Sequence, residues 1–429
     1  MNALRRMGVS VRPDALAFSV PGRIEVLGKH TDYAGGSSIL AASEQSVVIV
    51  AVPRNDSELH IHSVQSGESL QISISPSLEA AAGWANYPVT TIRRLASNFP
   101  DARTGADIAF LSSIPIAAGM SSSSALVVAL FLAVSAVNGL HDSEAWQAEL
   151  HTPELLAGYL AAMENGLSFG TLRGEAGVGT MGGSEDHTAM LCAREGELVQ
   201  YRFVPVRFQE SVAMPHDHCF VVASSGVAAE KAGAALQRYN RAAGLMQAAA
   251  ELWRQGAGRD DRTIGAALDA DPSAADRILN VLSASAHARF SQDDILSRVR
   301  QFIAEDREII PVALSALREG NLKRFGSTVD RSQQLAEELL GNQIAETEFL
   351  AREAREAGAV AASAFGAGFG GSVWAMVHTG MAESFLERWK SVYLRRFPEH
   401  VANARFMQTM AGERAGRLSL DNHSNSLVT

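Results

Sequence analysis

The chain has very little cysteine: its 429 residues contain only Cys192 and Cys219. Small secreted proteins that depend on a disulfide framework carry many more, so that class of protein is excluded. Each cysteine stands in an apolar, strand-like run, TAMLCA and HCFVVA. We therefore expect two buried, unpaired thiols in a reducing compartment, in preference to a catalytic cysteine.

The chain also lacks an excess of positive charge and a long apolar segment. Its formal net charge is −10, which argues against nucleic acid or an anionic membrane surface as the main partner and leaves room for a local basic site for a small anion. No uninterrupted apolar stretch follows Arg5 and Arg6, so no signal peptide is expected. The most apolar run, 125–137, is shorter than the about 20 residues that span a bilayer. We expect a cytoplasmic protein, a monomer or homodimer, that acts on a small molecule.

The chain is long enough for two ordinary domains. Its first half mixes strand-like segments with helices, and its second half is richer in long helices. We predict strands at 45–52, 59–64, 70–74, 108–114 and 372–377, and helices at 83–96, 125–137, 228–255, 262–268, 277–303, 333–357 and 382–396. These patterns predict an α+β protein with two lobes, 1–205 and 206–412, followed by a flexible tail at 413–429.

The passage Ile114 to Leu126, IPIAAGMSSSSAL, predicts a phosphate-binding turn. A strand, a proline and a small-residue turn lead into serines that open an apolar helix. This order points unpaired backbone N–H groups and the positive end of a helix dipole at one place, and serine hydroxyls can add hydrogen bonds or a Mg²⁺ ligand. The alternative is a serine-capped core helix with no ligand. The GxxxxGK[ST] loop is excluded because no lysine follows the glycine.

Two further passages concentrate glycines or polar side chains. Ala364 to Val377, AFGAGFGGSVWAMV, has four glycines within six positions, which lets the backbone approach another group closely; a tight structural bend is the alternative. Pro21 to Gly36, PGRIEVLGKHTDYAGG, joins a short apolar strand to a dense set of polar groups. That density indicates a polar ligand, or else a solvated loop.

A fourth passage, Gly177 to Ala189, GVGTMGGSEDHTA, places two carboxylates and a histidine after small, flexible positions. A carboxylate here could accept a proton from a hydroxyl, although acidic loop residues are usually only solvated. Two adjacent carboxylates, Glu185 and Asp186, leave open which of them faces a ligand, although neighbours in an extended segment point to opposite sides.

Together the four passages resemble the galactokinase branch of the GHMP kinases, the superfamily of galactokinase, homoserine, mevalonate and phosphomevalonate kinases. The resemblance covers most of the chain in the right order, and Trp84 to Tyr87 and Ser225 to Arg241 are similar to galactokinase segments as well. It implies a two-lobed GHMP kinase fold, with an N-terminal mixed sheet, a C-terminal α/β sandwich-like lobe and the active site between them. It also implies an ATP- and Mg²⁺-dependent kinase that phosphorylates the anomeric hydroxyl of galactose or a related sugar. The alternative is a non-catalytic sugar and ATP sensor on the same scaffold.

The resemblance further implies roles for single residues. Asp186 would accept the proton of the anomeric hydroxyl, and Arg23 would stabilise the negative charge that develops beside it. The implied substrate contacts are Lys29, His30, Asp32, Gly183 and Tyr239, and the implied nucleotide contacts are Trp84, Tyr87, Gly119, Ser121, Ser122, Ser123 and Ser124. The implied Mg²⁺ ligands are Ser123 and a glutamate, for which Glu164 matches by its helix-end context and Glu175 by its distance from Asp186.

The chain departs from the galactokinase pattern at several positions. Galactokinases usually have Gly-Arg-x-Asn-x-x-Gly-Glu-His-x-Asp-Tyr, and this chain has Glu25 for the asparagine and Lys29 for the glutamate. It also has Glu185-Asp186-His187 where an apolar residue, Asp and Gln are common. Because an ammonium cannot accept a hydrogen bond from a C6 hydroxyl but pairs with a carboxylate, Lys29 suggests a hexuronic acid such as galacturonate. The alternative is that Lys29 points away or pairs with Glu25, and the sugar is neutral.

Overall fold

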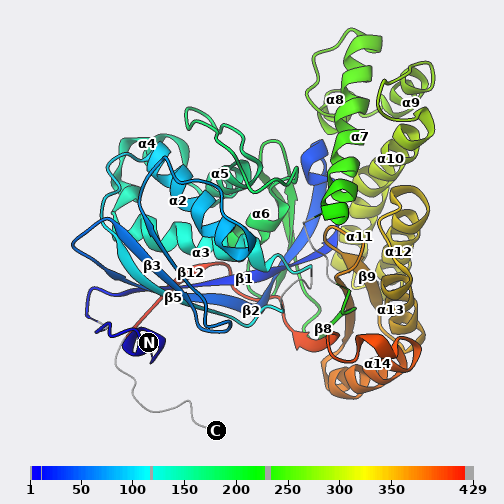
Figure 1. Ribbon diagram of the computed structural model, residues 1–429. Helices are drawn as coiled ribbons and strands as arrows, with labels where there is room; N and C mark the ends of the chain where they lie inside the picture. The colour runs from blue at the N-terminus through cyan, green and yellow to red at the C-terminus, as the bar shows by residue number, and fades with distance from the viewer. Residues whose placement is uncertain (1, 11, 116–118, 228–232, 421–429) are drawn as a thin grey trace.

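Two β-sheets mark two lobes that lie side by side in the computed structural model (Figure 1). The structure describes residues 2–10, 12–115, 119–227 and 233–420. In these residues the eight-stranded first sheet has the order β12-β1-β2-β5-β3-β4, with β6 on β2 and β7 on β6, and the second sheet has the order β11-β8-β10-β9. The strands are β1 (Leu16–Leu27), β2 (Ser37–Pro53), β3 (Glu58–Ser63), β4 (Ser69–Ser73), β5 (Ala106–Ser112), β6 (Glu197–Arg202), β7 (Arg207–Ala213), β8 (His218–Ser224), β9 (Ala361–Phe365), β10 (Ser372–His378), β11 (Arg405–Thr409) and β12 (Gly416–Leu418).

A layer of helices covers the first sheet. Its members are α2 (Asn86–Asn98), α3 (Ser122–Val137), α5 (Pro153–Asn165) and α6 (Glu185–Cys192), while α1 (Asn2–Arg6) and α4 (Glu144–Glu149) are short. Helix α3 packs on β1 and β2. After its first turn its residues are apolar around the whole helix, which is typical of a helix in the protein core. The core helix predicted at 125–137 is thus confirmed, and its serines form its first turn.

The second lobe is mostly helical and stands as a column beside the first sheet (Figure 1). Helices α7 to α10 enclose a core of their own, and α13 and α14 pack on the second sheet. The helices are α7 (Gly233–Ala257), α8 (Ile264–Ala270), α9 (Ala275–Ser283), α10 (Gln292–Ala304), α11 (Ile310–Arg318), α12 (Leu322–Leu335), α13 (Ala345–Glu356) and α14 (Ala382–Arg396), with π-helical turns η4 (Glu305–Ile309) and η5 (Ala336–Leu340). The α+β, two-lobed prediction is confirmed.

Several predicted elements differ from the structure. The helix predicted at 333–357 is two helices, because Gly341 adopts a left-handed φ of 65° that ends η5 before α13 begins. The pattern at 277–303 is likewise divided between α9 and α10. Cys192 is buried as predicted but ends helix α6 instead of lying in a strand. The helix predicted at 228–255 begins at Gly233 in the structure, and residues 228–232 lie outside the described residues.

The division of the chain into 1–205 and 206–412 is our proposal. In the structure β7 still belongs to the first sheet and β8 opens the second, so the chain passes between the sheets at 214–217. Strand β12 pairs with β1, although it lies in the segment predicted as a flexible tail; its backbone completes the edge of the first sheet. No helix of the described residues is long and apolar enough to cross a membrane.

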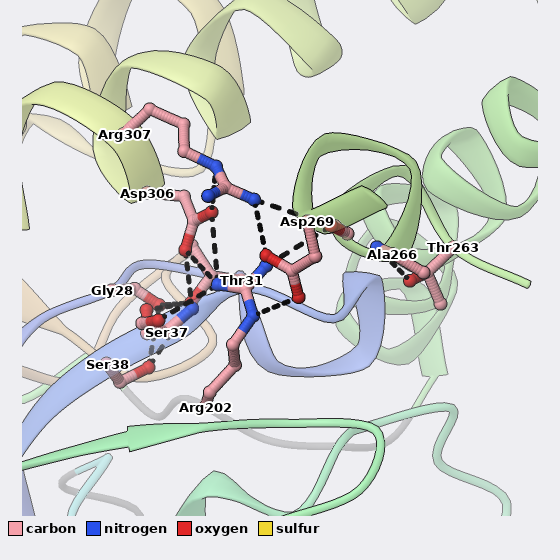
Figure 2. A network of polar contacts seen from close by, with 11 residues as sticks. Gly28, Thr31, Ser37, Ser38, Arg202, Thr263, Ala266, Asp269, Asp306 and Arg307 are labelled. Carbon is pink, nitrogen blue, oxygen red and sulfur yellow. Dashed lines mark hydrogen bonds and ion pairs between the residues drawn. The ribbon is translucent and has the colours of Figure 1, made fainter. Parts of the chain in front are cut away.

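A partly buried ionic network joins the two lobes (Figure 2). Asp306 of η4 accepts hydrogen bonds from the Ser37 backbone N–H at 2.7 Å and from Arg202 Nη1 at 3.1 Å. Arg202 also pairs with Asp269 at 2.6 Å, and Arg307 pairs with the same aspartate at 2.7 Å. Because these residues come from β2, β6, α8 and η4, the network fixes the helical column against the first sheet.

Candidate active site

A cavity that opens to solvent lies where β1, α5 and α6 of the first lobe meet α7 and the turn before β10 of the second. Seven residues expected at the site from the sequence line it: Arg23, His30, Asp32, Glu164, Gly183, Asp186 and Tyr239. The lining is rich in carboxylates, since Glu25 and Glu185 also belong to it. The cavity is therefore suited to a ligand that carries many hydroxyl groups or a cation.

The ion pair of Arg23 and Asp186 forms the centre of this cavity. Arg23 Nε donates to Asp186 Oδ1 at 2.7 Å, and Arg23 Nη1 donates to the Gly119 carbonyl at 2.9 Å. Arg23 lies on β1 next to a β-bulge between Pro21 and Arg23, which re-aims side chains along the strand. Burial alone would lower the pKa of Arg23, but the charges of Asp186, Glu185 and Glu25 raise it, so the guanidinium stays charged.

Asp186 stands in the first turn of α6, and the passage that the sequence predicts as extended is helical there. Asp32 Oδ2 accepts the backbone N–H of Glu185 at 3.2 Å and so caps this helix from another element. In this conformation both Glu185 and Asp186 face Arg23, at 3.4 Å and 2.7 Å, so the expectation of opposite directions is wrong. Burial raises the pKa of Asp32, while the N–H groups of Glu185 and Tyr33 oppose the shift.

Gly183 lies where any side chain would collide with the site. A Cβ atom on Gly183 would stand 2.2 Å from Asp32 Oδ2, and one on Gly182 would stand 2.6 Å from the Tyr239 hydroxyl. Asn165, the last residue of α5, holds this turn, because its side-chain amide donates to the Gly182 carbonyl and accepts from the Gly182 N–H. The two glycines thus let the backbone pass between an acid of η1 (Asp32–Ala34) and a tyrosine of α7.

His30 and Tyr239 form an aromatic wall of the cavity, with ring centroids 5.5 Å apart. His30 Nδ1 is 2.9 Å from the Tyr33 hydroxyl and its Nε2 is 3.1 Å from the Ala367 carbonyl. Burial, followed by the charges of Asp32 and Asp186, raises the pKa of Tyr239 well above its ordinary value. A neutral phenol at this place can donate a hydrogen bond to a ligand hydroxyl.

The serine-containing turn and the glycine-rich passage fold against each other. A Cβ atom on Gly366 would lie 3.0 Å from both Arg23 Nη2 and the Gly119 carbonyl, and one on Gly119 would lie 3.5 Å from Gly371 Cα. A side chain on Gly366 would therefore be crowded, whereas a Cβ atom on Gly119 would make only an ordinary van der Waals contact. Gly119 has a φ of 72° and Ser121 a φ of 60°, so the chain turns sharply before α3. Part of the passage, residues 116–118, lies outside the described residues.

The other residues expected to contact a nucleotide are near α3 but outside the cavity lining. Ser122 and Ser123 are half-buried in the first turn of α3, and Ser121 and Ser124 are buried. Trp84 packs on Phe110 with centroids 5.9 Å apart, and Tyr87 lies in α2, which packs on α3. Trp84 and Tyr87 therefore remain proposed nucleotide contacts.

Lys29 does not line the cavity that the described residues form. It is buried, and its Nζ donates to Ser363 Oγ at 2.6 Å and to Ser332 Oγ at 3.1 Å. Ser332 in turn donates to the buried carboxylate of Glu305, so its hydroxyl lies between the Lys29 ammonium and that carboxylate. The expected substrate contact of Lys29 is not found, because its ammonium is held by the second lobe.

The two glutamates considered as Mg²⁺ ligands lie in different places. Glu164 lines the cavity and its Oε1 is 3.2 Å from His187 Nε2. Glu175 is outside the lining and faces Arg93 at 3.7 Å. Within the described residues no cluster of three or more His, Cys, Asp or Glu could hold a metal. A single carboxylate and a serine fit Mg²⁺, which commonly binds one or two protein groups plus phosphates and water.

The sequence pointed to some lining residues only as departures from a pattern. Glu25, Glu185 and His187 all line the cavity, and each replaces a residue type that is usual in galactokinases. Thr180 lies within the passage Gly177 to Ala189 but was not singled out, and Asn165 lies before that passage; only their place in the lining identifies them. An ionisable residue at a motif position that normally holds a non-ionisable one was the one signal in the sequence that could have found the first three.

Comparisons with known proteins agree with this geometry. Residues 5–53 match the galactokinase galactose-binding signature, residues 86–166 match the GHMP kinases N terminal domain, and residues 313–394 match the GHMP kinases C terminal domain. A galactokinase of Roseiflexus sp. (strain RS-1) is 25% identical over 372 residues, 85% of this chain and 84% of the relative. A galactokinase of Mycobacterium bovis is 26% identical over 369 residues, 84% of this chain and 89% of the relative.

Solved structures show the same fold. A Lactococcus lactis galactokinase complexed with galactose has a TM-score of 0.77 at 21% identity and covers 97% of this chain and 98% of its own. A mevalonate kinase of Methanococcus jannaschii has a TM-score of 0.53 at 15% identity, covering 93% and 99%. The fold and the site together define a small-molecule kinase of the GHMP type. The chain belongs to the GHMP kinase family, in its galactokinase-like branch, and is a sugar kinase of that type.

Proposed function

We propose that this protein transfers the γ-phosphoryl group of ATP to the anomeric hydroxyl of galactose or a closely related neutral sugar. The observation that carries the proposal is the 2.7 Å pair of Arg23 Nε and Asp186 Oδ1 inside the cavity, with Gly119 of the serine-containing turn bonded to the same guanidinium. This arrangement puts a proton acceptor and a fixed positive charge beside the phosphate-binding turn. Phosphoryl transfer depends mainly on such positioning and charge stabilisation.

In the proposed reaction Asp186 accepts the proton of the sugar hydroxyl while that oxygen bonds to the γ-phosphorus and the bond to the β-phosphate oxygen breaks, which releases ADP. Arg23 favours the ionised form of Asp186 and stabilises the charge that develops on the transferred group. His30, Asp32 and Tyr239 orient the sugar through its other hydroxyls. Mg²⁺ at Glu164 and Ser123 would neutralise phosphate charge when bound.

A neutral sugar is favoured over a hexuronic acid. The hexuronic acid hypothesis depended on Lys29, and the Lys29 ammonium is bonded to two serines of the second lobe. The cavity lining carries five carboxyl groups, Glu25, Asp32, Glu164, Glu185 and Asp186, against the guanidinium of Arg23. A carboxylate on the sugar would add to this negative charge at a cost in binding free energy.

A panel of sugars tests the proposal. The purified chain is incubated with ATP, Mg²⁺ and galactose, glucose, galactosamine or galacturonate, and ADP release is measured, with phosphorus NMR to locate the new phosphate. We expect turnover with galactose, phosphate on its C1 and much slower turnover with galacturonate. Saturable binding of sugar and ATP without ADP release would instead favour a sensor, and faster turnover of galacturonate would contradict the neutral sugar.

A further inference from the structure

Two departures from the galactokinase pattern meet inside the cavity lining. Glu25 follows Arg23 by two residues on β1, and Glu185 is the first residue of α6. Their exposed fractions are 3% and 4%, although isolated buried carboxylates are rare. Residues i and i+2 of a strand share a face, so Glu25 accompanies Arg23 toward α6.

The hydrogen bonds around this pair leave a place for one proton. Glu185 Oε2 accepts from Ser38 Oγ at 2.8 Å, and Glu25 Oε2 accepts from the Gly366 N–H at 3.2 Å. Glu25 Oε1 is buried and finds no donor among the ordinary N–H and O–H groups of the described residues. The Glu25 and Glu185 carboxyl groups are within hydrogen-bonding distance of each other. Two carboxylates cannot bond to each other, whereas a carboxyl group donates to a carboxylate.

The surroundings favour one bound proton. The pair faces Arg23 and Lys29 from β1 and the turn after it, and Asp32 from η1. Asp186 of α6 pairs with the same Arg23. The charges of the pair also act on the phenols of Tyr33 from η1 and Tyr239 from α7. The neighbouring polar groups are the Ser38 hydroxyl of β2 and the Gly366 N–H before β10. Burial and the charge of Glu25 raise the pKa of Glu185 well above its ordinary value, and burial also raises the pKa of Glu25.

We propose that Glu25 and Glu185 share one proton and act as a positioning pair that leaves Arg23 free to hold Asp186, so that loss of this proton sets the alkaline limit of activity. Arg23 Nε is within reach of both Glu185 Oε1, at 3.4 Å, and Asp186 Oδ1, at 2.7 Å. A neutral Glu185 competes weakly for the guanidinium. An ionised Glu185 competes with Asp186 directly and repels it.

Infrared spectroscopy tests the shared proton without any turnover. The carbonyl band of a protonated carboxylic acid is recorded near neutral pH in wild type, Glu25→Gln and Glu185→Gln, and in Glu195→Gln, an exposed glutamate, as control. We expect the band in wild type and the control and its loss in either pair variant, because one remaining carboxyl beside Arg23 ionises. If wild type shows no such band, or if the band remains in both Glu25→Gln and Glu185→Gln, the two glutamates do not share a proton.

The pH profile tests the positioning role, which depends on the proposed function. Above the pKa of the pair, kcat/KM of wild type should fall about tenfold per pH unit. Each pH profile of kcat/KM is normalised to its own maximum. The variants should keep their maximal kcat/KM to higher pH than wild type; they are Glu25→Gln, Glu185→Gln and Glu25→Asn, the last of which restores the residue usual in galactokinases. An alkaline limb unchanged in all folded variants would overturn the positioning role. If the infrared band of the protonated acid is present but the protein phosphorylates no sugar, the shared proton stands and the proposed function is contradicted.

Discussion

The guanidinium of Arg23 and the carboxylate of Asp186 are 2.7 Å apart although 163 positions separate them in the sequence. One stands on β1 and the other in the first turn of α6, and Asp32 fixes that turn by accepting the Glu185 N–H. Replacing Asp186 with Asn keeps the shape but removes the proton acceptor. We expect kcat to fall by at least roughly a hundredfold, measured as ADP release at saturating sugar and ATP.

The matched control is Asp101→Asn, which changes an aspartate on the surface. Its kcat should equal that of wild type. Near-normal kcat in Asp186→Asn, with a folded protein by circular dichroism, would reject the role of Asp186 as the base.

Lys29 should matter for stability and not for the choice of sugar. Lys29→Met leaves the hydroxyls of Ser332 and Ser363 without their charged donor inside the protein. We expect a loss of about 3 kcal/mol in the free energy of unfolding and an unchanged ratio of kcat/KM for galactose and galacturonate. Urea denaturation and steady-state kinetics measure the two quantities.

Lys323→Met removes an exposed lysine and should change the unfolding free energy by no more than about 0.5 kcal/mol. If Lys29→Met or Lys29→Glu strongly changes the ratio of kcat/KM for galactose and galacturonate, the Lys29 ammonium must reach the substrate. The proposal of a neutral sugar would then lose the observation on which it mainly depends.

The sequence could predict those parts of the site that short motifs carry. Arg23, His30 and Asp32 belong to one short motif, whose strand and turn place them together in the cavity. Asp186 and Tyr239 come from two other passages, and they were expected to join the first three only from the resemblance to galactokinases. The direction of Lys29 could not be predicted, since it depends on Ser332 and Ser363, more than 300 positions away. The helical start of α6 depends likewise on Asp32, and the break after η5 on the left-handed Gly341. Contacts between distant segments are what a local pattern omits.

Glu164 is the glutamate expected to hold Mg²⁺, because it lines the cavity next to His187. Glu164→Gln should raise the Mg²⁺ concentration for half-maximal activity by at least about tenfold at constant ATP. Glu175→Gln should leave that concentration unchanged, since Glu175 faces Arg93 outside the lining. A Mg²⁺ dependence that moves with Glu175 and not with Glu164 would reverse the assignment.

Asp306 should be essential for the junction of the two lobes. Its side chain is fully buried and bonds to Arg202 and the Ser37 N–H (Figure 2). Asp306→Ala leaves the Arg202 charge without one of its partners, so we expect a loss of about 3–5 kcal/mol in unfolding free energy by urea denaturation. Asp14→Ala breaks only the exposed pair with Arg12 and should cost no more than about 1 kcal/mol. Equal effects of the two substitutions would contradict a stabilising network.

The raised pKa of Glu185 predicts a pH dependence of stability. Burial and the charge of Glu25 raise it above the usual 4.5, so the folded chain keeps a proton that the unfolded chain releases. The stability that this proton contributes is fully present below pH 4.5 and is lost as the pH rises through the folded-state pKa. Across that window the unfolding midpoint of wild type should fall relative to that of Glu185→Gln, which cannot ionise.

Thermal unfolding in a series of buffers measures this difference. The gap between Glu185→Gln and wild type should widen in favour of the variant as the pH rises and become constant above the folded-state pKa of Glu185. Glu195→Gln, which changes an exposed glutamate, should follow wild type in parallel at every pH. If Glu185→Gln also runs parallel to wild type, the carboxyl of Glu185 is ionised in the folded protein throughout, and the proton between Glu25 and Glu185 does not exist.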